Sequence, residues 1–369
     1  MLPLNWQRVR LGDVGKPCMC KRVMKHQTTR YGEIPFYKIG TFGNTADAFI
    51  SKKLFLEYKT KYSFPKKGDI LISASGTIGR AVIYNGKPAY FQDSNIVWID
   101  NDETLVKNDF LFYAYSNVKW NTEHTTILRL YNDNFRNTLI PLPPLNEQIA
   151  IANILSDVDR YLYSLDALIL KKESVKKALS FELLSQRKRL KGFNQAWQRV
   201  RLGDIANYLT SNLSAEQITQ QGKIKVYDVN NFIGYTNTTF ISDKPYISIV
   251  KDGSVGRVRI LPPKTNILST MGALVANHKT TTEFLFYLLS NFDFKNFTSG
   301  SIIPHIYFKD YKEKTIFLPP LNEQIAIANI LSALDHEIIS LKNKKRQFEN
   351  IKKALNHDLM SAKIRVLKK

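Results

Sequence analysis

Cysteine is scarce in this chain, and long apolar runs are missing. The only two cysteines among 369 residues, Cys18 and Cys20, lie too close in the sequence to brace a fold. No apolar run reaches the ~18 residues that a membrane-spanning helix needs. The first residues, from Met1 to Trp6, lack the apolar core of a signal peptide. We therefore expect a cytoplasmic protein in a reducing environment.

Acidic residues are outnumbered by basic ones. Lys and Arg total 53 against 32 Asp and Glu, which gives a net charge of +21. Like charges in such excess repel one another unless a polyanion neutralises them. Nucleic acid and anionic membranes are the ordinary partners of such a chain, and we favour nucleic acid. Hydrophobic residues make up 44% of the chain, enough for buried cores in two or three domains.

Catalytic and metal-binding motifs are also missing. Methyltransferases hold the target base with an Asn/Asp-Pro-Pro-Tyr/Phe motif, whereas both proline pairs here read Leu-Pro-Pro-Leu, without an amide or carboxylate. Asp47 with Glu57 to Lys59 has the spacing of a nuclease site, but the pattern does not recur in the second half of the chain. Cys18, Cys20 and His26 lack a fourth zinc ligand nearby. No kinase, hydrolase or metalloprotease motif occurs. We expect no catalytic residue, metal or cofactor in this chain.

Two segments of the sequence occur twice. The eight residues Trp6–Asp13 return letter for letter as Trp197–Asp204, and the fifteen residues Leu142–Ser156 return as Leu318–Ser332. Fifteen consecutive identities do not arise by chance, so the chain is an internal duplication. Each half consists of a variable block followed by a nearly constant block.

The constant blocks are predicted to form long helices. Pro143-Pro144 blocks helix on the upstream side, and apolar residues then recur at steps of three and four, as in a coiled coil. These apolar positions are Leu155, Val158, Leu162, Leu165 and Ile169 in the first copy and Leu331, Leu334, Ile338, Leu341, Phe348, Ile351, Leu355 and Leu359 in the second. We expect the first helix to run from Leu145 to Leu190, roughly 68 Å, with Gly192 as its stop. No insertion separates the two copies, as a rigid spacer requires, because one added residue rotates everything beyond it by roughly 100°.

The variable blocks are predicted to be mixed α/β. Each has short apolar strands on both sides of a glycine turn, followed by an aromatic-rich helix. The strands expected are 68–73, 81–84 and 95–99 in the first block and 246–250 and 257–260 in the second, with helices 109–115 and 284–289. The first block is longer by fifteen residues, since the tryptophan motifs are 191 residues apart and the proline motifs 176.

The chain is therefore expected to be an α+β protein with four parts. They are an α/β globular block (1–141), a first spacer helix (142–192), a second α/β block (193–317) and a second spacer helix (318–369). Joined tail to head, the sequence would recreate its own internal junction. We therefore predict two long antiparallel helices in a coiled coil, a circular pseudo-twofold arrangement, and chain termini close together.

A Pro-Pro-Leu-Asn-Glu-Gln run leads into a long helix twice in this chain, after blocks that begin with Trp-Gln-Arg-Val-Arg-Leu-Gly-Asp and contain a glycine turn. Over essentially the full length, this combination resembles the specificity subunit of type I restriction–modification enzymes. The resemblance implies that each block is a target recognition domain that reads one half of an asymmetric site in double-stranded DNA. It also implies that the helices set the spacing and dock two methyltransferase subunits, which restriction subunits then join. S-adenosylmethionine, ATP and Mg would be bound by those partners.

The two glycine turns are the first candidates for DNA contact. Residues 75–80 align with residues 252–257. Glycine lets a backbone approach a phosphate closely, and hydroxyl and amide groups fix the register. The alternative is a hairpin connection that requires positive φ. The DNA-binding candidates in these turns are Ser75, Gly76, Thr77 and Arg80 in the first block and Gly253, Ser254 and Arg257 in the second.

Base reading needs long polar side chains at the depth of a groove. The further candidates are Lys38, Thr41, Gln92, Asn95, Arg129 and Tyr131 in the first block and Tyr227, Asn230, Lys251, His305 and Tyr307 in the second. For any single one of them, a phosphate contact or a place on the solvated surface is favoured over base reading. His305 lies in a segment that aligns with Leu130-Tyr131, and a buried structural histidine is an equally good interpretation.

The residues that open the two helices are identical. They are Asn146, Glu147 and Gln148 in the first copy and Asn322, Glu323 and Gln324 in the second. Such residues cap a helix and complement its dipole. The family resemblance implies contact with methyltransferase subunits, and identity in both copies suits two identical partners.

Two alternative functions remain open. The chain could serve a related system in which restriction and methylation are fused in one polypeptide, which the neighbouring genes would decide. It could also be a coiled-coil scaffold that binds nucleic acid without sequence preference. Salt-dependent binding that does not discriminate between DNA sequences would favour the scaffold.

Overall fold

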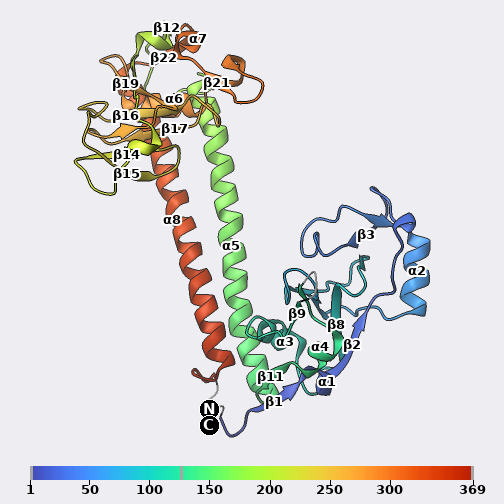
Figure 1. The fold of residues 1–369 in the computed structure, drawn as a ribbon. Helices are drawn as coiled ribbons and strands as arrows, with labels where there is room; N and C mark the ends of the chain where they lie inside the picture. Colours follow the sequence, from blue (N-terminus) through green and yellow to red (C-terminus); the bar gives the residue numbers. More distant parts are fainter. Residues whose placement is uncertain (1–2, 125–127, 367–369) are drawn as a thin grey trace. The chain divides into compact units, whose positions relative to one another are not determined.

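The computed structural model of the chain describes residues 3–124 and 128–366. The chain divides into two compact units (Figure 1). Unit 1 comprises residues 1–165 and 344–369, and unit 2 comprises residues 166–343. Each unit therefore contains one variable block together with a part of each long helix.

Unit 1 is built around a four-stranded antiparallel sheet. Its strands and helices before the first long helix are β1 (Gln7–Arg10), α1 (Leu11–Val14), β2 (Gly15–Met19), β3 (Ile34–Tyr37), β4 (Phe49–Ile50), α2 (Lys52–Lys61), β5 (Ile70–Ser73), β6 (Ala81–Ile83), β7 (Tyr90–Phe91), β8 (Ile96–Asn101), α3 (Asn108–Tyr115), β9 (Glu123–His124), β10 (Leu128–Arg129), α4 (Asn132–Asn137) and β11 (Leu139–Leu142). The four-stranded sheet has the order β2-β8-β5-β6, a smaller sheet has the order β4-β3-β7, and β1 pairs with β11. The fully buried Phe110 of α3 joins Ile72 of β5 in one core.

Unit 2 repeats this plan. Its strands and helices are β12 (Gln198–Arg201), β13 (Ala206–Thr210), β14 (Ile224–Tyr227), β15 (Phe232–Thr236), β16 (Tyr246–Val250), β17 (Val258–Leu261), β18 (Asn266–Ile267), β19 (Met271–Ala276), α6 (Thr282–Ser290), β20 (Thr298–Ser299), β21 (His305–Ile306), α7 (Phe308–Tyr311) and β22 (Thr315–Leu318). The sheets have the orders β13-β19-β16-β17 and β15-β14-β18, and β12 pairs with β22. In residues 166–343 the ten-residue helix α2 has no counterpart. It therefore accounts for much of the extra length of the first block.

The two long helices are α5 (Leu145–Leu184) and α8 (Leu321–Met360), each of 40 residues. The predicted start at Leu145 is confirmed, but the predicted end at Leu190 with Gly192 as the stop is wrong. The chain leaves α5 at Gln186, which takes a φ of 62°, and the Lys188 N–H then donates to the carbonyl of Glu182 at 3.1 Å. Ala362, with a φ of 57°, occupies the same place after α8.

The helices α5 and α8 are antiparallel in each unit (Figure 1). In unit 1 the ring centre of Tyr161 on α5 lies 4.6 Å from that of Phe348 on α8. Asp159, which precedes Tyr161 on α5, pairs with Lys352, which follows Phe348 on α8. In unit 2, Lys172 pairs with Glu337 at 2.8 Å and Lys176 with Asp335 at 2.5 Å. As one helix advances the other retreats, which confirms the predicted antiparallel pairing within each unit.

The predicted apolar seam is largely buried. Leu155, Leu331 and Leu359 have 0–1% of their surface exposed. Ile351 is the exception, because 51% of its surface is exposed. Lys352 occupies the inner face of α8 through its bond to Asp159, and Ile351 points about 100° away from it around the helix.

The two ends of the described chain lie together in unit 1. The Arg365 guanidinium lies 5.9 Å from the centre of the Trp6 ring. The prediction that the termini are close is thus confirmed for the described residues, and positions 1 and 369 lie outside them. The pseudo-twofold relation between the units stays a prediction. Among residues 3–124 and 128–366, none of the helices combines the length and the apolar composition of a membrane span.

Candidate nucleic-acid interface

Each glycine turn connects two antiparallel strands, β5 to β6 and β16 to β17. The hairpin interpretation is confirmed by the backbone, because all four glycines have positive φ. The values are 66° for Gly76, 81° for Gly79, 82° for Gly253 and 80° for Gly256. A side chain at any of these positions would strain the turn.

The two glycines of each turn differ in their surroundings. A Cβ on Gly79 would overlap the Trp120 ring, and one on Gly256 would overlap Phe294. At Gly76 and Gly253 a Cβ would meet nothing within 4 Å, and both residues are exposed. The second glycine therefore anchors the turn on an aromatic ring, while the first leaves an open tip that another molecule can approach.

In unit 1 a second segment pairs with the glycine turn. The Gly76 N–H donates to the carbonyl of Leu128 at 3.2 Å, and the Leu130 N–H donates to that of Ala74 at 2.9 Å. These bonds make Ser75 and Arg129 direct cross-strand neighbours. Tyr131, with 40% of its surface exposed, comes directly after Leu130. The structure thus brings four candidates together, Ser75, Gly76, Arg129 and Tyr131.

Unit 2 has the same pairing. The Gly253 N–H donates to the carbonyl of Pro304 and the Ile306 N–H to that of Lys251, both at 2.9 Å. Asp252 and His305 are the cross-strand neighbours here. Tyr307 comes next in the chain, with 49% of its surface exposed. The two units therefore present the same backbone at this surface and different side chains on it.

The arginine of each turn joins the turn to a loop of the smaller sheet. Arg80 donates from Nη1 to the carbonyl of Phe42 at 3.0 Å, in the loop after β3. Arg257 donates from Nη2 to Oδ1 of Asn230 at 2.7 Å, in the loop after β14. These bonds bring Thr41 and Asn230 toward the turns. They also hold each arginine by one side of its guanidinium.

Several candidate side chains hold the loops in place. Oε1 of Gln92 accepts from the Ile39 N–H at 2.9 Å, and Oδ1 of Asn95 accepts from the Ser75 hydroxyl at 2.8 Å. Lys38 forms an ion pair with Asp47 at 2.8 Å.

Two more candidates take part in local contacts, and two lie exposed at the turn tips. Oγ1 of Thr41 accepts from the Lys38 N–H at 3.1 Å. The Arg259 guanidinium stacks over the Tyr227 ring, with its Cζ 5.3 Å from the ring centre. The exposed Thr77 and Ser254 lie at the turn tips next to Gly76 and Gly253.

At the start of α5, only one of the three predicted partner-contact residues is exposed. Oε2 of Glu147 accepts from Nε1 of Trp6 at 3.0 Å, and Arg365 binds both carboxylate oxygens at 2.7 and 3.0 Å. Gln148 is fully buried and bonds to the backbone of Leu105 and Lys107. A direct contact with a partner is therefore left to Asn146, whose Oδ1 accepts from the Glu147 N–H.

The start of α8 has the same arrangement. Glu323 accepts from Nε1 of Trp197 at 2.9 Å and from Arg189 at 2.6 and 3.2 Å. Gln324 is fully buried and accepts from the Thr280 hydroxyl at 2.8 Å. Asn322 is exposed. In each unit the tryptophan at the start of the variable block thus bonds to the glutamate of the long helix after that block, and the same buried glutamate pairs with an arginine from the segment that follows the other long helix.

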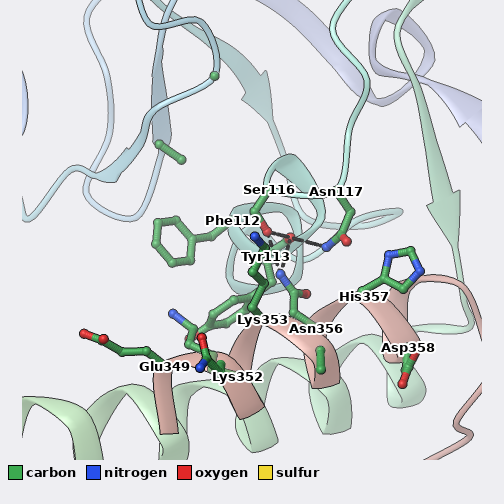
Figure 2. A pocket seen from close by; sticks show the side chains of 14 residues that line it. Phe112, Tyr113, Ser116, Asn117, Glu349, Lys352, Lys353, Asn356, His357 and Asp358 are labelled. Carbon is green, nitrogen blue, oxygen red and sulfur yellow. Dashed lines mark hydrogen bonds between the residues drawn. The ribbon is translucent and has the colours of Figure 1, made fainter. Parts of the chain in front are cut away.

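A second tie, which sequence reasoning did not predict, joins three helices in each unit. In unit 1 the Tyr113 hydroxyl of α3 donates to Asp159 of α5 at 2.8 Å. Asp159 also pairs with Lys352 of α8, whose Nζ lies 5.5 Å from the Tyr113 ring centre. Burial, and then the bond to Asp159, raise the pKa of Tyr113 above its ordinary value. Figure 2 shows Tyr113 and Ser116 beside Lys352 and Asn356 of α8, and the Asn356 amide donates to the Ser116 hydroxyl at 2.5 Å. These four residues help to line a cavity of about 960 Å³.

Unit 2 forms the same tie with Tyr287, Asp335 and Lys176. The Tyr287 hydroxyl donates to Asp335 at 2.9 Å, and Lys176 pairs with Asp335 and covers the ring at 5.7 Å. Identity between the two copies was a signal that could have found these residues, since all three types recur at matching places. Sequence spacing alone does not show that they meet.

The two cysteines belong to unit 1. Cys20 is buried, and burial raises the pKa of its thiol to about 12. Burial also raises the pKa of Cys18. In the ranges that the structure describes, no three His, Cys, Asp or Glu side chains lie close enough to hold a metal ion.

The sequence is similar to a known domain family and to several proteins of that family. The profile of the type I restriction modification DNA specificity domain matches residues 3–172 and 194–350. A protein of Haemophilus influenzae named as a type I restriction enzyme specificity subunit is 64% identical over 148 residues, which cover 40% of this chain and 38% of the relative. The MjaVIII specificity subunit of Methanocaldococcus jannaschii is 26% identical, with 99% of this chain and 94% of the relative covered. A second specificity subunit named for that organism, MjaX, is 31% identical over 81% of this chain and 79% of the relative.

Solved structures share the fold. The S subunit of a type I restriction–modification system from M. genitalium superposes with a TM-score of 0.63 at 20% identity, over 97% of this chain and 98% of that one. A chain from a structural study of type I complex assembly gives a TM-score of 0.58 at 16% identity, over 99% and 100%. The chain therefore belongs to the family of type I restriction modification DNA specificity domains, of which it carries two copies.

Proposed function

We propose that this chain is the sequence-recognition subunit of a type I restriction–modification complex, and that each unit reads one half of an asymmetric, bipartite site in double-stranded DNA. One observation carries the proposal. Both units present an exposed glycine turn paired with a second segment on the same backbone, and the side chains on that backbone differ. Equal scaffolds with unequal side chains suit two half-sites of unequal sequence.

The charge of the chain supports this proposal. A net charge of +21 favours binding to the phosphates of DNA, and that contribution weakens as salt is added. The exposed turn tips supply hydroxyl and backbone N–H groups for phosphate contact, which fix register without reading sequence. The base-reading candidates lie beside those tips.

The helix starts suit two identical partners. Leu145 and Ile149 of α5 expose 40% and 46% of their surface, and Leu321 and Ile325 of α8 expose 45% and 49%. These matching apolar residues flank the exposed Asn146 and Asn322. We infer that two methyltransferase subunits dock on these surfaces, and that α5 and α8 set the distance between the half-sites.

Catalysis belongs to the partners in this proposal. The methyltransferase subunits would use S-adenosylmethionine to methylate adenine, and restriction subunits joined through the complex would use ATP and Mg. This chain would contribute no catalytic residue. A system with fused restriction and methylation would need the same two readers, and the neighbouring genes distinguish the two cases.

The test is to express this chain with its cognate methyltransferase and to map methylated positions across the host genome. We expect one bipartite, non-palindromic site. Replacing residues 14–140 with the matching block of a relative should change one half-site and leave the other intact. A change in both halves would refute modular reading, and methylation or binding without sequence preference would favour the scaffold function instead.

An insertion tests the spacer. Four residues added within α5 or α8 lengthen one helix and rotate all residues beyond the insertion by roughly 400°, that is, 40° past one full turn. We expect altered spacing between the half-sites or loss of methylation, with both half-site sequences kept. Unchanged spacing in an active variant would contradict the role of the helices as a spacer.

A further inference from the structure

At the tip of unit 1, the basic residue Arg129 has a paired residue on each side. Arg129 on β10 pairs across the isolated bridge with Ser75 and, on its other side, with Glu123 of β9. Directly paired residues of antiparallel strands point to the same face. We call Ser75, Arg129 and Glu123 the tip row of unit 1.

The tip row of unit 2 consists of Asp252, His305 and Ser299. His305 on β21 pairs across the bridge with Asp252 and, on its other side, with Ser299 of β20. The backbone bonds of the two rows match, so the residues correspond one to one. Each row therefore has a basic residue between an acid and a serine, but the acid and the serine have changed sides.

In unit 2 the acid fixes the basic residue. Oδ1 of Asp252 lies 2.6 Å from Nδ1 of His305, and the two side chains are 30% and 35% exposed. The Tyr307 ring stacks on the imidazole with an interplanar angle of 24°. Because Nδ1 is bound to Asp252, only Nε2 is left to meet another molecule.

In unit 1 the two residues that flank Arg129 bond to other side chains, whereas Asp252 of unit 2 binds His305. Ser75 is buried, and its hydroxyl donates to Asn95 instead. Glu123 is exposed on the far side of Arg129, where its Oε1 accepts from Asn134 at 2.9 Å. A guanidinium offers a rigid fork of donors, whereas the fixed imidazole offers a single nitrogen.

We propose that the central residue of each tip row selects one base pair of its half-site, and that the exchange of acid and serine makes the two units select differently. Arg129 matches guanine, whose N7 and O6 accept two hydrogen bonds in the major groove. His305 makes one hydrogen bond through Nε2 and discriminates between bases less sharply. This inference rests on the proposed function and names the residues that select within each half-site.

The test exchanges the rows. The triple variant Asp252→Ser, Ser299→Glu, His305→Arg gives unit 2 the row of unit 1. The purified complex with its methyltransferase subunits is then measured by competition binding, with duplexes that differ from the mapped site by one base pair. We expect preference at one position of the second half-site to shift toward guanine by at least about tenfold, with the first half-site unchanged. The Ser254→Ala variant is the control, since loss of a phosphate contact at the turn tip weakens binding to all duplexes alike.

The outcomes separate this inference from the proposed function. If the triple variant prefers the same bases as the wild type, the tip rows do not select. If the triple variant binds no duplex, the His305→Ala variant is measured in the same assay. Weaker preference of this variant at one base pair supports the inference. Wild-type preference at every base pair, or loss of all binding at an unchanged unfolding temperature, overturns it. A wild-type complex without any bipartite site would instead refute the proposed function itself.

Discussion

The two units agree where they hold the variable blocks to the helices, and they differ at the tips. The buried ion pair with its tryptophan and the three-helix tie use identical residue types in both units. The tip rows carry Arg129 in one unit and His305 in the other, with acid and serine exchanged. Duplication has therefore kept the residues that fix the variable blocks and changed those of the tip rows. Position and selectivity are separate properties of this fold.

A second difference concerns buried polar groups. In unit 1 the Tyr115 hydroxyl and Oδ1 of Asn356 are buried without a hydrogen-bond partner in the described chain. The matching residues of unit 2 are Leu289 and Ser180, and both are buried. A buried polar group without a partner costs roughly 1–3 kcal/mol. We therefore expect unit 1 to be the less well stabilised of the two at these positions.

The largest expected effect tests whether the two buried ion pairs are equivalent. The Glu147 and Glu323 side chains are 2% and 0% exposed. Removing either carboxylate leaves an arginine without its counter-charge, which costs about 3–5 kcal/mol. Glu147→Ala and Glu323→Ala should therefore lower the free energy of unfolding in urea by similar amounts. Glu313→Ala is the control, because this 54% exposed side chain should contribute no more than about 1 kcal/mol.

A thiol probe assigns each loss to a unit. The chain has two cysteines, both in unit 1, and Cys20 is buried with a pKa raised to about 12. The neutral thiol alkylates slowly near pH 8. We expect Glu147→Ala to raise the rate of Cys20 alkylation by iodoacetamide at least about tenfold, and Glu323→Ala to leave it unchanged. Equal acceleration by both variants would show that the units open together.

The three-helix ties predict sensitivity to alkali. Burial and the bonds to Asp159 and Asp335 raise the pKa of Tyr113 and Tyr287 in the folded state. Above about pH 10 the unfolded chain releases these protons while the folded chain keeps them. Stability is therefore full below pH 10 and falls as the pH rises further.

Thermal unfolding at pH 8 and pH 10.5 measures this loss. Tyr113→Phe and Tyr287→Phe should each lower the unfolding temperature at pH 8 by a few degrees, for a lost hydrogen bond of about 1–2 kcal/mol. Each should also reduce the further drop at pH 10.5. A drop as large as in the wild type would exclude these tyrosines as its cause.

The smallest expected effect is a gain. Tyr115→Phe removes the hydroxyl without a partner and should stabilise unit 1 by about 1 kcal/mol. Tyr246→Phe is the matched control in unit 2, because that buried hydroxyl bonds to Thr265 at 2.9 Å. The control should be destabilised by a similar amount. Destabilisation by both would mean that the Tyr115 hydroxyl has a partner, such as bound water.

The sequence predicted those parts of the fold that depend on neighbours in the chain. Pro144 and the apolar repeat marked the start of α5, and the glycine turns were placed between two strands, with a hairpin connection as the alternative to DNA contact. The end of α5 was missed because Gln186, a residue that seldom adopts positive φ, ends the helix in place of a glycine.

The candidate site was predicted in part for the same reason. The glycine turns and His305 stood out as motifs, and alignment of the halves placed the second segment opposite its copy. The bond between Trp6 and Glu147 joins residues 141 positions apart, and that between Arg365 and Glu147 spans 218. Such pairs are set by tertiary packing, so Glu147 could be read only as a cap or a surface contact.

Arg365 of unit 1 occupies the place that Arg189 holds in unit 2. Arg189 belongs to an unbroken connection between a helix and the next block, whereas Arg365 stands near the last described residue. The segment after α8, whose Ala362 and Val366 pack against the core of unit 1, is thus as much a part of the fold as an interior loop. A shortened protein that lacks Arg365 would leave the buried Glu147 carboxylate without its counter-charge. Removing these few residues should therefore lower the free energy of unfolding more than removing one turn of a surface helix.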